Sequence, residues 1–316
     1  MSRKWSWQRM LLVGALAAPA MGAEALAQTP PSQVSEVSFQ VPGDEQNEYF
    51  EVGGASNGYT FNTNVANGAT YWVVALENEG AGVVGDEGIV DMAVKLTGSA
   101  SASGHAWAST ANETYSGTPN AIFTEGDLEG SGATYLLVRV AQNAPTLPAK
   151  GQDWDEDDDG SYSDSGDGGA FVAAAGNWVV LDSVAACAET NDLSTLRLYA
   201  LSGVNFTVGD PDGNSSWTGS YVDTNQRFAA GGGNHEGRGA FTEIEYVGRT
   251  AGGLWVAANV NDDGANDPIW VIAEDDESPN SPKEPECADQ NDSTYSPFHD
   301  GREVTKPGLA NTAADN

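Results

Sequence analysis

The sequence predicts an all-β protein built as one or two domains of the β-sandwich or jelly-roll type. No apolar pattern with a period of 3.6 residues persists for three turns, so there is almost no helical signal. Instead, short runs rich in Val, Thr, Tyr and Trp recur between clusters of Gly, Asn, Asp and Ser. The 38 glycines among 316 residues suit the tight turns that such strands require.

Alternation and apolar content predict the individual strands. The segment Phe241–Val247 places Glu243 and Glu245 on one face, with Ile244 and Tyr246 at the alternate positions, as in a strand with one wet face. In the first half of the chain, strands are expected at 37–41, 59–63, 70–76, 90–96 and 134–140. In the second half, they are expected at 177–182, 195–201, 204–208, 216–222, 241–247, 254–258 and 269–273.

Composition changes along the chain predict its organisation. A stretch with two prolines followed by DWDEDDDGSYSDSGDGG has no apolar periodicity and separates two strand-rich halves as a junction or long functional loop. Beyond residue 275 the chain is polar and proline-containing, which favours disorder over most of the tail. The expected units are a secretory signal at 1–27, a β-sandwich domain at 28–141, the junction at 142–169, a second β-rich half at 170–275 and the tail at 276–316.

The first 27 residues have the three parts of a secretory signal peptide. Three basic residues precede the apolar run Met10–Ala18, and Ala25-Leu26-Ala27 forms a small-x-small cleavage site, so the mature chain is expected to begin at Gln28. The apolar run is too short to cross about 30 Å of hydrocarbon as an anchor. We therefore expect an exported protein, secreted or at the cell surface, with the periplasm as the alternative.

The charge excludes several classes of partner. The chain carries 46 acidic and 13 basic residues, for a formal net charge of −33. Nucleic acids and anionic membranes would be repelled, because binding them requires clustered Lys and Arg. Self-repulsion on this scale favours a high-salt habitat, in which counterions screen the carboxylates.

The junction contains a candidate calcium loop. Alternate carboxylates followed by Gly160 can converge on one ion when the backbone turns, and hard oxygen ligands suit Ca²⁺. The stretch resembles the first half of an EF-hand-type calcium loop, but Gly166 occupies the twelfth position and no helices flank it. A structural Ca²⁺ loop between β elements is therefore expected, with a solvated linker as the alternative. The candidate ligands are Asp155, Asp157, Asp159, Ser161, Ser163 and Asp164.

A second, weaker match to a calcium loop is Asn259-x-Asn261-x-Asp263-Gly264. It lies between two predicted strands, and its two asparagines would lower the affinity for a cation. An ordinary turn rich in Asn, Asp and Gly is the alternative that we favour.

Two cysteines, Cys187 and Cys287, are predicted to form a single disulfide, because an exported chain meets an oxidising compartment. Such a bond would tether the polar tail to the second half of the protein. Two unpaired thiols are the alternative. The absence of a CxxC pair from the sequence argues against a redox or zinc site.

Three tryptophans, Trp107, Trp154 and Trp217, are flanked by small or polar residues and are candidates for stacking on sugar rings. Partial packing in the core is the alternative for each. The other tryptophans of the predicted strands are expected to be core residues: Trp72, Trp178, Trp255 and Trp270.

No apparent catalytic motif in the sequence has the flanking secondary structure that it requires. Gly54-Ala55-Ser56-Asn57-Gly58 matches a nucleophile elbow by letter, but that elbow requires a following helix. The sequence therefore predicts a non-catalytic, exported, Ca²⁺-stabilised structural or adhesive protein of the cell surface, matrix or an appendage, with self-assembly as its expected interaction. The alternatives are a module that binds extracellular polysaccharide and a secreted hydrolase with catalytic carboxylates, hidden among the many acidic residues.

Overall fold

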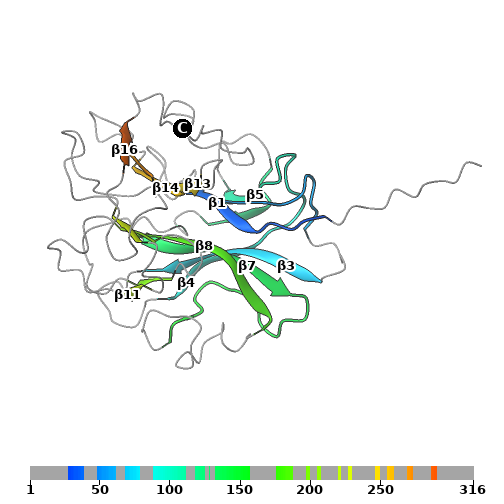
Figure 1. Ribbon diagram of the computed structural model, residues 1–316. Helices are drawn as coiled ribbons and strands as arrows, with labels where there is room; N and C mark the ends of the chain where they lie inside the picture. The colour runs from blue at the N-terminus through cyan, green and yellow to red at the C-terminus, as the bar shows by residue number, and fades with distance from the viewer. Residues whose placement is uncertain are drawn as a thin grey trace, which may run out of the picture.

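The fold is known from a computed structural model (Figure 1). Side chains are described for most of the chain up to residue 199, for 247 and for 249, and elsewhere only the backbone of short strands is described. The described residues are 28–38, 48–61, 68–78, 88–111, 118–124, 128, 132–156, 176–187, 197–199, 205–207, 220–221, 227–229, 246–249, 255–259, 269–272 and 286–289.

The described residues form strands and turns, which confirms the all-β prediction for this part of the chain. No helix long and apolar enough to cross a membrane occurs among them. Two large sheets lie one above the other in Figure 1, and a small parallel pair, β9 (Arg197–Leu198) with β11 (Ser220–Tyr221), forms a third, separately hydrogen-bonded sheet.

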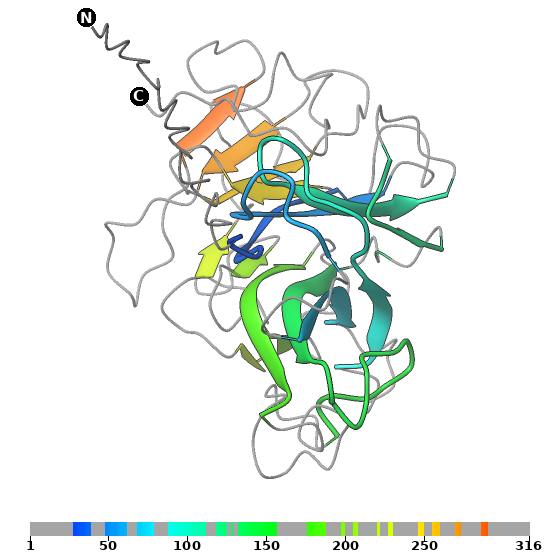
Figure 2. The ribbon, with the colours of Figure 1, turned by 90° about the vertical axis from the view of Figure 1, so that its right-hand side faces the viewer.

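The first sheet has eight strands and is antiparallel except for its last pair, β5 and β6. Figure 2 shows the C-terminal strands continuing this sheet beyond β1. In spatial order the strands are β16 (Glu286–Asp289), β15 (Ile269–Ile272), β14 (Trp255–Asn259), β13 (Tyr246–Arg249), β1 (Gln33–Ser38), β2 (Tyr49–Gly53), β5 (Ala106–Thr110) and β6 (Ala121–Phe123).

The second sheet has six strands. The pairs among β8, β7, β3 and β4 are antiparallel, whereas β10 lies parallel to both of its neighbours. In spatial order the strands are β12 (Arg227–Ala229), β10 (Asn205–Thr207), β8 (Trp178–Cys187), β7 (Gly132–Ala141), β3 (Ala69–Glu77) and β4 (Val90–Lys95).

Strands from both sides of the junction share each sheet. In the first sheet β1 pairs with β13, with Val37 opposite Val247, and in the second β7 pairs with β8 over nearly the whole length of both strands. The long-range pairing is therefore made between residues 28–141 and residues beyond 176, and not only within each range.

One hydrophobic core draws side chains from both large sheets. Phe50 and Val52 of β2 belong to the same buried cluster as Tyr135 and Leu137 of β7. The rings of Phe50 and Tyr135 meet edge to face, with centroids 6.0 Å apart and an interplanar angle of 88°. Edge-to-face contact is a favoured arrangement of aromatic pairs, so this contact helps to fix the two sheets against each other.

A second apolar cluster covers the other face of the six-stranded sheet. Val74 and Leu136, which alternate with residues of the first core, pack here with Trp154 and Trp178. Strands β3 and β7 are therefore buried on both faces, which explains their nearly continuous apolar sequences.

The first part of the predicted junction, residues 142–156, is held against this cluster. The Gly151 N–H donates to the Val90 carbonyl at 2.7 Å, and the Val90 N–H donates to the Gln152 carbonyl at 2.8 Å. The Trp178 Nε1–H donates to the Thr146 carbonyl at 3.1 Å. This stretch is therefore anchored to the edge of the sheet at β4, and the Asp-rich residues 157–169 lie outside the described residues.

The strand predictions succeeded best where the apolar runs were long. The expected strands at 70–76, 90–96, 134–140, 177–182, 254–258 and 269–273 correspond to β3, β4, β7, β8, β14 and β15. The expected strand at 59–63 is instead a single bridge between Thr60 and Ser99 followed by a turn at Phe61, with 62–63 outside the described residues. Strands β2, β5, β6 and β12 were not predicted, nor was β16, which contains Cys287, the expected tether of a tail predicted to be mostly disordered.

Candidate functional site

Polar side chains form two rows on one face of the eight-stranded sheet. Strand register places Glu36 opposite Glu51 and Glu51 opposite Trp107, and the next row is Ser38, Tyr49 and Ser109. This face is the opposite one from the core, because Val37, Phe50 and Ala108 alternate with these residues and belong to the core cluster. Together with Ser35 and His105, the two rows make up the outer-face array: Ser35, Glu36, Ser38, Tyr49, Glu51, His105, Trp107 and Ser109.

A β-bulge brings Ser35 into the array. The register between β1 and β2 shifts between Val34 and Glu36, so that Ser35 is an extra residue in the ladder. A bulge re-aims the side chains next to it. The Ser35 hydroxyl consequently lies against the Cα of Gly53, where an added Cβ would stand 2.4 Å from the Ser35 Oγ. A larger residue at position 53 would therefore force the Ser35 side chain to shift.

The array is polar and yet buried. Glu36 and Glu51 are each 1% exposed, and Ser38 and Ser109 are fully buried. Hydrogen-bond partners are absent for the hydroxyls of Ser35, Ser38 and Ser109, and also for the Trp107 Nε1–H. Buried polar atoms without partners are rare in native proteins and favour a bound water, an ion or a ligand.

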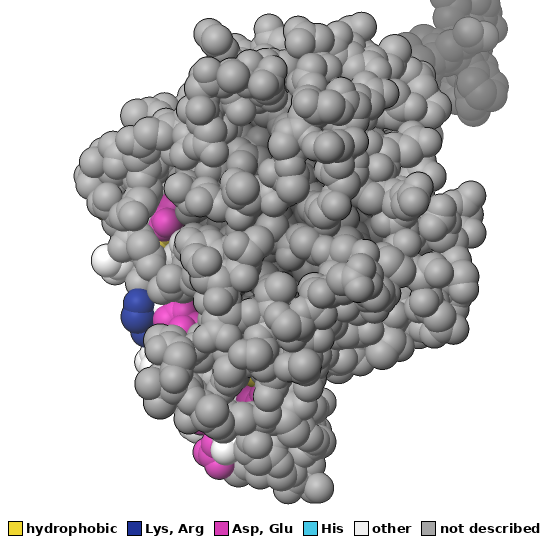
Figure 3. Space-filling view, turned by 90° about the vertical axis from the view of Figure 1, so that its left-hand side faces the viewer, with side chains coloured by type: hydrophobic (Ala, Val, Ile, Leu, Met, Phe, Trp, Pro, Cys, Tyr) yellow, Lys and Arg dark blue, Asp and Glu magenta, His cyan; other side chains and the backbone are white. Residues whose placement is uncertain are grey.

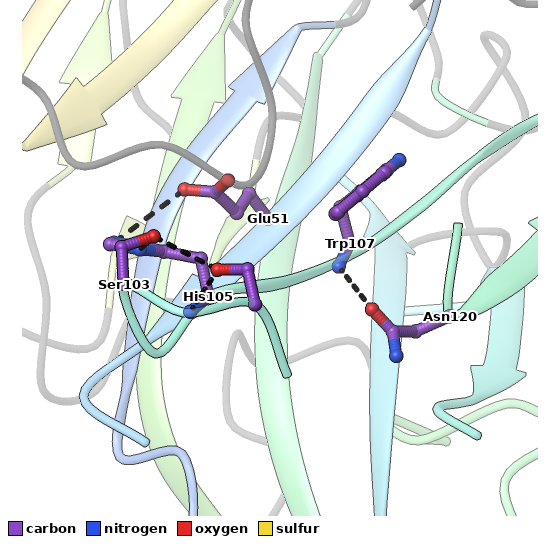
Figure 4. A network of polar contacts seen from close by, with 6 residues as sticks. Glu51, Ser103, His105, Trp107 and Asn120 are labelled. Carbon is purple, nitrogen blue, oxygen red and sulfur yellow. Dashed lines mark hydrogen bonds and ion pairs between the residues drawn. The ribbon is translucent and has the colours of Figure 1, made fainter. Parts of the chain in front are cut away.

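His105 links the array to a surface turn. Its Nδ1 lies 3.1 Å from the Ser103 Oγ, and its Nε2 lies 3.9 Å from a carboxylate oxygen of Glu51. Figure 4 shows the Glu51 carboxylate pointing toward His105 and Ser103. Burial lowers the pKa of His105, because the protonated ring loses hydration, so the neutral imidazole is favoured near neutral pH.

The array can bind a small polar species or a cation, because it combines carboxylate acceptors with hydroxyl groups that can donate or accept. The Ser103, His105 and Glu51 side chains have the types of a hydrolytic triad, but their geometry is not that of one. The Ser103 hydroxyl also lies 2.9 Å from the Ser101 Oγ, and Ser101 Oγ accepts from the His105 backbone N–H at 3.1 Å. These bonds are those of a local turn.

The candidate calcium loop is described only at its first position. Asp155 is fully buried, and its Oδ2 accepts a hydrogen bond of 2.7 Å from the Tyr199 hydroxyl. Its backbone N–H donates to the Asp153 Oδ1 at 3.0 Å. The other candidate ligands, Asp157, Asp159, Ser161, Ser163 and Asp164, lie outside the described residues.

The weaker loop is also mostly outside the described residues. Asn259 ends β14, whereas Asn261 and Asp263 are not described. Within the described part of the chain, no group of three or more His, Cys, Asp and Glu side chains is arranged to hold a metal ion. Both calcium loops therefore stay predictions.

The candidate sugar-stacking tryptophans are buried where they are described. Trp154 is fully buried and packs on Trp178, with ring centroids 5.3 Å apart, and Trp107 is 7% exposed. Trp154 belongs to the second apolar cluster, whereas Trp107 lies on the outer face of the eight-stranded sheet and belongs to neither cluster. A stacking role on sugars stays a prediction for both. Trp217 lies outside the described residues.

The two cysteines occur in different sheets. Cys187 ends β8 in the six-stranded sheet, and Cys287 lies in β16 at the far edge of the eight-stranded sheet. No disulfide occurs among the described residues, and the pairing stays a prediction.

The outer-face array was not predicted from the sequence. Its acidic and hydroxyl residues alternate with apolar ones, which is the usual pattern of a strand with one solvated face. The signal that could have drawn attention to it is the repetition of this pattern in three separate segments, at Ser35–Ser38, Tyr49–Gly53 and His105–Ser109. Burial of the polar face could not be read from any one of them.

Comparison of the chain with protein-family models, with curated proteins and with solved structures found no match. The functional conclusion therefore depends on the residues and their arrangement.

Proposed function

We propose that the chain is an exported, non-catalytic β protein of the cell surface, matrix or an extracellular appendage, in which two stacked sheets act as a structural or adhesive scaffold stabilised by Ca²⁺. One observation supports this proposal most directly: carboxylate and hydroxyl side chains of types that could act in catalysis make hydrogen bonds that stabilise the fold. Asp155 is bonded to Tyr199, and the Ser56 hydroxyl accepts the Thr29 backbone N–H at 2.7 Å.

The acidic surface supports the same conclusion. On the face shown in Figure 3, carboxylates are conspicuous among the described side chains that reach the surface, with basic groups beside one of them. A net charge of −33 opposes close contact between copies of the chain unless cations bridge or screen the carboxylates. Assembly of such a scaffold is therefore expected to depend on Ca²⁺ or on high salt.

Electron microscopy and light scattering of the mature protein test the proposal directly. Addition of Ca²⁺ after chelation is expected to convert dispersed particles into fibres, sheets or larger assemblies. A protein that stays strictly monomeric at high concentration, with and without Ca²⁺, would contradict the structural role.

The contribution of the acidic loop is tested by thermal unfolding. Ca²⁺ is expected to raise the melting temperature of the wild type, and Asp157→Ala with Asp159→Ala should abolish this rise. Glu156→Ala is the control, because Glu156 is an exposed acid of the same segment that is not a candidate ligand. Absence of a Ca²⁺-dependent rise in the wild type would reduce the segment to a solvated linker.

A secreted hydrolase with catalytic carboxylates is the second candidate, because the buried residues Glu36 and Glu51 lie opposite each other across β1 and β2. Release of product from a panel of peptide and glycan substrates, lost in Glu36→Gln or Glu51→Gln, would replace the scaffold proposal with this one.

A further inference from the structure

The first described residues of the chain lie along the turn that follows β2. The Thr29 backbone N–H donates to the Ser56 hydroxyl at 2.7 Å, and the Ser56 N–H donates to the Thr29 carbonyl at 2.9 Å. Three residues further on, the Ser32 N–H donates to the Gly53 carbonyl at 3.0 Å. Residues 28–32 therefore extend the antiparallel pairing of β1 with β2 beyond the ends of both strands.

The Gln28 side chain continues the same contact. Its Nε2–H donates to the Gly58 carbonyl at 3.3 Å, and its Oε1 accepts the Thr60 backbone N–H at 3.4 Å. Both ends of the amide group are therefore bonded to the backbone of the turn, as the backbone of a neighbouring strand would be. We call Ser56, Gly58 and Thr60 the N-terminal dock.

Two prolines lower the entropic cost of this arrangement. Pro30 and Pro31 separate the docked residues Gln28 and Thr29 from β1, and Pro31 is buried. Because the proline ring fixes φ and restricts the residue before it, this segment has few conformations to lose on docking. Hydrogen bonds that would be weak in a flexible tail can consequently hold residues 28 and 29 in place.

Gln28 is the residue at which the mature chain is expected to begin, and a glutamine at that position can react with its own amine. The free α-amino nitrogen attacks the side-chain carbonyl carbon Cδ, a lactam ring forms, and the Cδ–Nε2 bond breaks as ammonia leaves with one proton of the amine. The reaction needs no other reactant. It requires the side chain to fold back on its own backbone, whereas the dock holds the amide against Gly58 and Thr60.

We propose that the turn at 56–60 is a docking site for the mature N-terminus that keeps Gln28 from cyclising. The docked protein keeps a positively charged α-amino group in a chain with 46 acidic and 13 basic residues, whereas cyclisation removes that charge. The inference rests on the export and leader removal of the proposed function, but not on the scaffold role or on Ca²⁺.

Mass spectrometry of the secreted, full-length mature protein tests the proposal. The chain is expressed with its leader in a secreting host, and its N-terminal peptide is followed during incubation at neutral pH for the mass loss of ammonia. Cyclisation in the folded protein is expected to be at least about fivefold slower than in the same chain unfolded in guanidinium chloride, because it requires the loss of a hydrogen bond of typical net strength. This comparison needs no variant, so a failure to fold cannot confound it.

Ser56→Ala is the variant that weakens the dock. It removes the acceptor of the Thr29 N–H, so cyclisation in the folded variant should be about fivefold faster than in the wild type. Ser103→Ala is the matched control, because its hydroxyl belongs to the neighbouring turn and is bonded to Ser101 and His105. This control should leave the rate unchanged.

Equal rates of cyclisation in the folded and the unfolded wild type, or a Ser56→Ala rate no higher than that of the wild type, would overturn the dock alone. A mature chain that begins at another residue would overturn the predicted cleavage site together with the dock, and the same spectra give the first residue. The two failures are therefore distinguishable, and the assembly test by microscopy is independent of both.

Discussion

Asp182 of β8 and Arg249 of β13 form an ion pair that joins the two large sheets, with the Arg249 Nη2 2.7 Å from the Asp182 Oδ2. The same carboxylate oxygen accepts the Val34 backbone N–H at 2.8 Å. Val34 immediately precedes the bulge residue Ser35, so Asp182 supports the bulge from the core side while the outer-face array lies on the other side.

Removal of the Arg249 guanidinium group from this ion pair is expected to destabilise the protein. Arg249→Ala leaves a carboxylate that is 7% exposed without its counter-charge, and breaking a mostly buried pair costs about 3 kcal/mol of unfolding free energy. Urea unfolding measures the loss. Arg139→Ala, an exposed arginine of β7, is the matched control, and its effect should stay within about 0.5 kcal/mol. Equal effects of the two substitutions would show that the pair contributes nothing.

The free energy of unfolding should change with pH as the Asp182 carboxyl group titrates. Burial raises the pKa of Asp182 above its usual 3.8, against the opposing attraction of Arg249 and the hydrogen bonds from Val34 and Ser183. Because the folded pKa is the higher one, the stabilisation from this group is fully present below the unfolded pKa and is lost as pH rises through the folded pKa. The unfolding free energy of the wild type relative to Asp182→Asn should therefore fall as the pH is raised from acid toward neutral. A constant or rising difference would contradict the shift.

Trp154 is expected to act as a structural residue. It is fully buried against Trp178, so Trp154→Ala should lower the unfolding free energy by about 3–5 kcal/mol through lost contact and a residual cavity. Chemical denaturation measures this. Leu147→Ala in the same segment, where the side chain is 51% exposed, should have little effect. Loss of glycan retention in Trp154→Ala at unchanged stability would instead support the stacking hypothesis.

A double-mutant cycle tests the close approach at Gly53. Gly53→Ala places a methyl group 2.4 Å from the Ser35 Oγ and should cost about 1–3 kcal/mol through overpacking. In a Ser35→Ala background the clash with Oγ disappears, so the same substitution should cost less. Additive effects of the two substitutions in unfolding experiments would show that the two positions do not interact.

Salt should stabilise the protein. Screening of the net charge of −33 reduces self-repulsion in the folded state, so the melting temperature should rise between about 0.1 and about 2 M NaCl. The melting temperature should rise in the same way when KCl replaces NaCl, because screening does not depend on the identity of the cation. A flat profile in both salts would remove the argument for a high-salt habitat.

The success and failure of the sequence predictions follow from what determines each strand. Strands β3 and β7 have long apolar runs because both faces are buried, and such runs are visible in the sequence alone. Strand β2 contains Glu51 between core residues, and β5 is rich in small residues, so neither has a strong apolar signal. Their positions are decided by pairing with β1 and with each other.

The candidate functional residues also divide into those with a local sequence signal and those whose role depends on distant segments. Asp155 was identified as a candidate ligand because carboxylate spacing is local, and Ser35 was not, because its role depends on a register shift between two strands. Trp107 and Trp154 were candidates for the surface because their sequence neighbours are small or polar, yet their burial depends on segments that come from elsewhere in the chain.

The amino-acid sequence by itself determined the all-β class, the longer strands and the acidic character, because alternation, turn residues and charge are properties of neighbouring residues. Only the tertiary structure decided that strands from both halves share each sheet and that one polar face, with Glu36 opposite Glu51, is buried. Burial and cross-strand contact arise when distant segments meet, and their energies depend on neighbours that no local window of sequence contains.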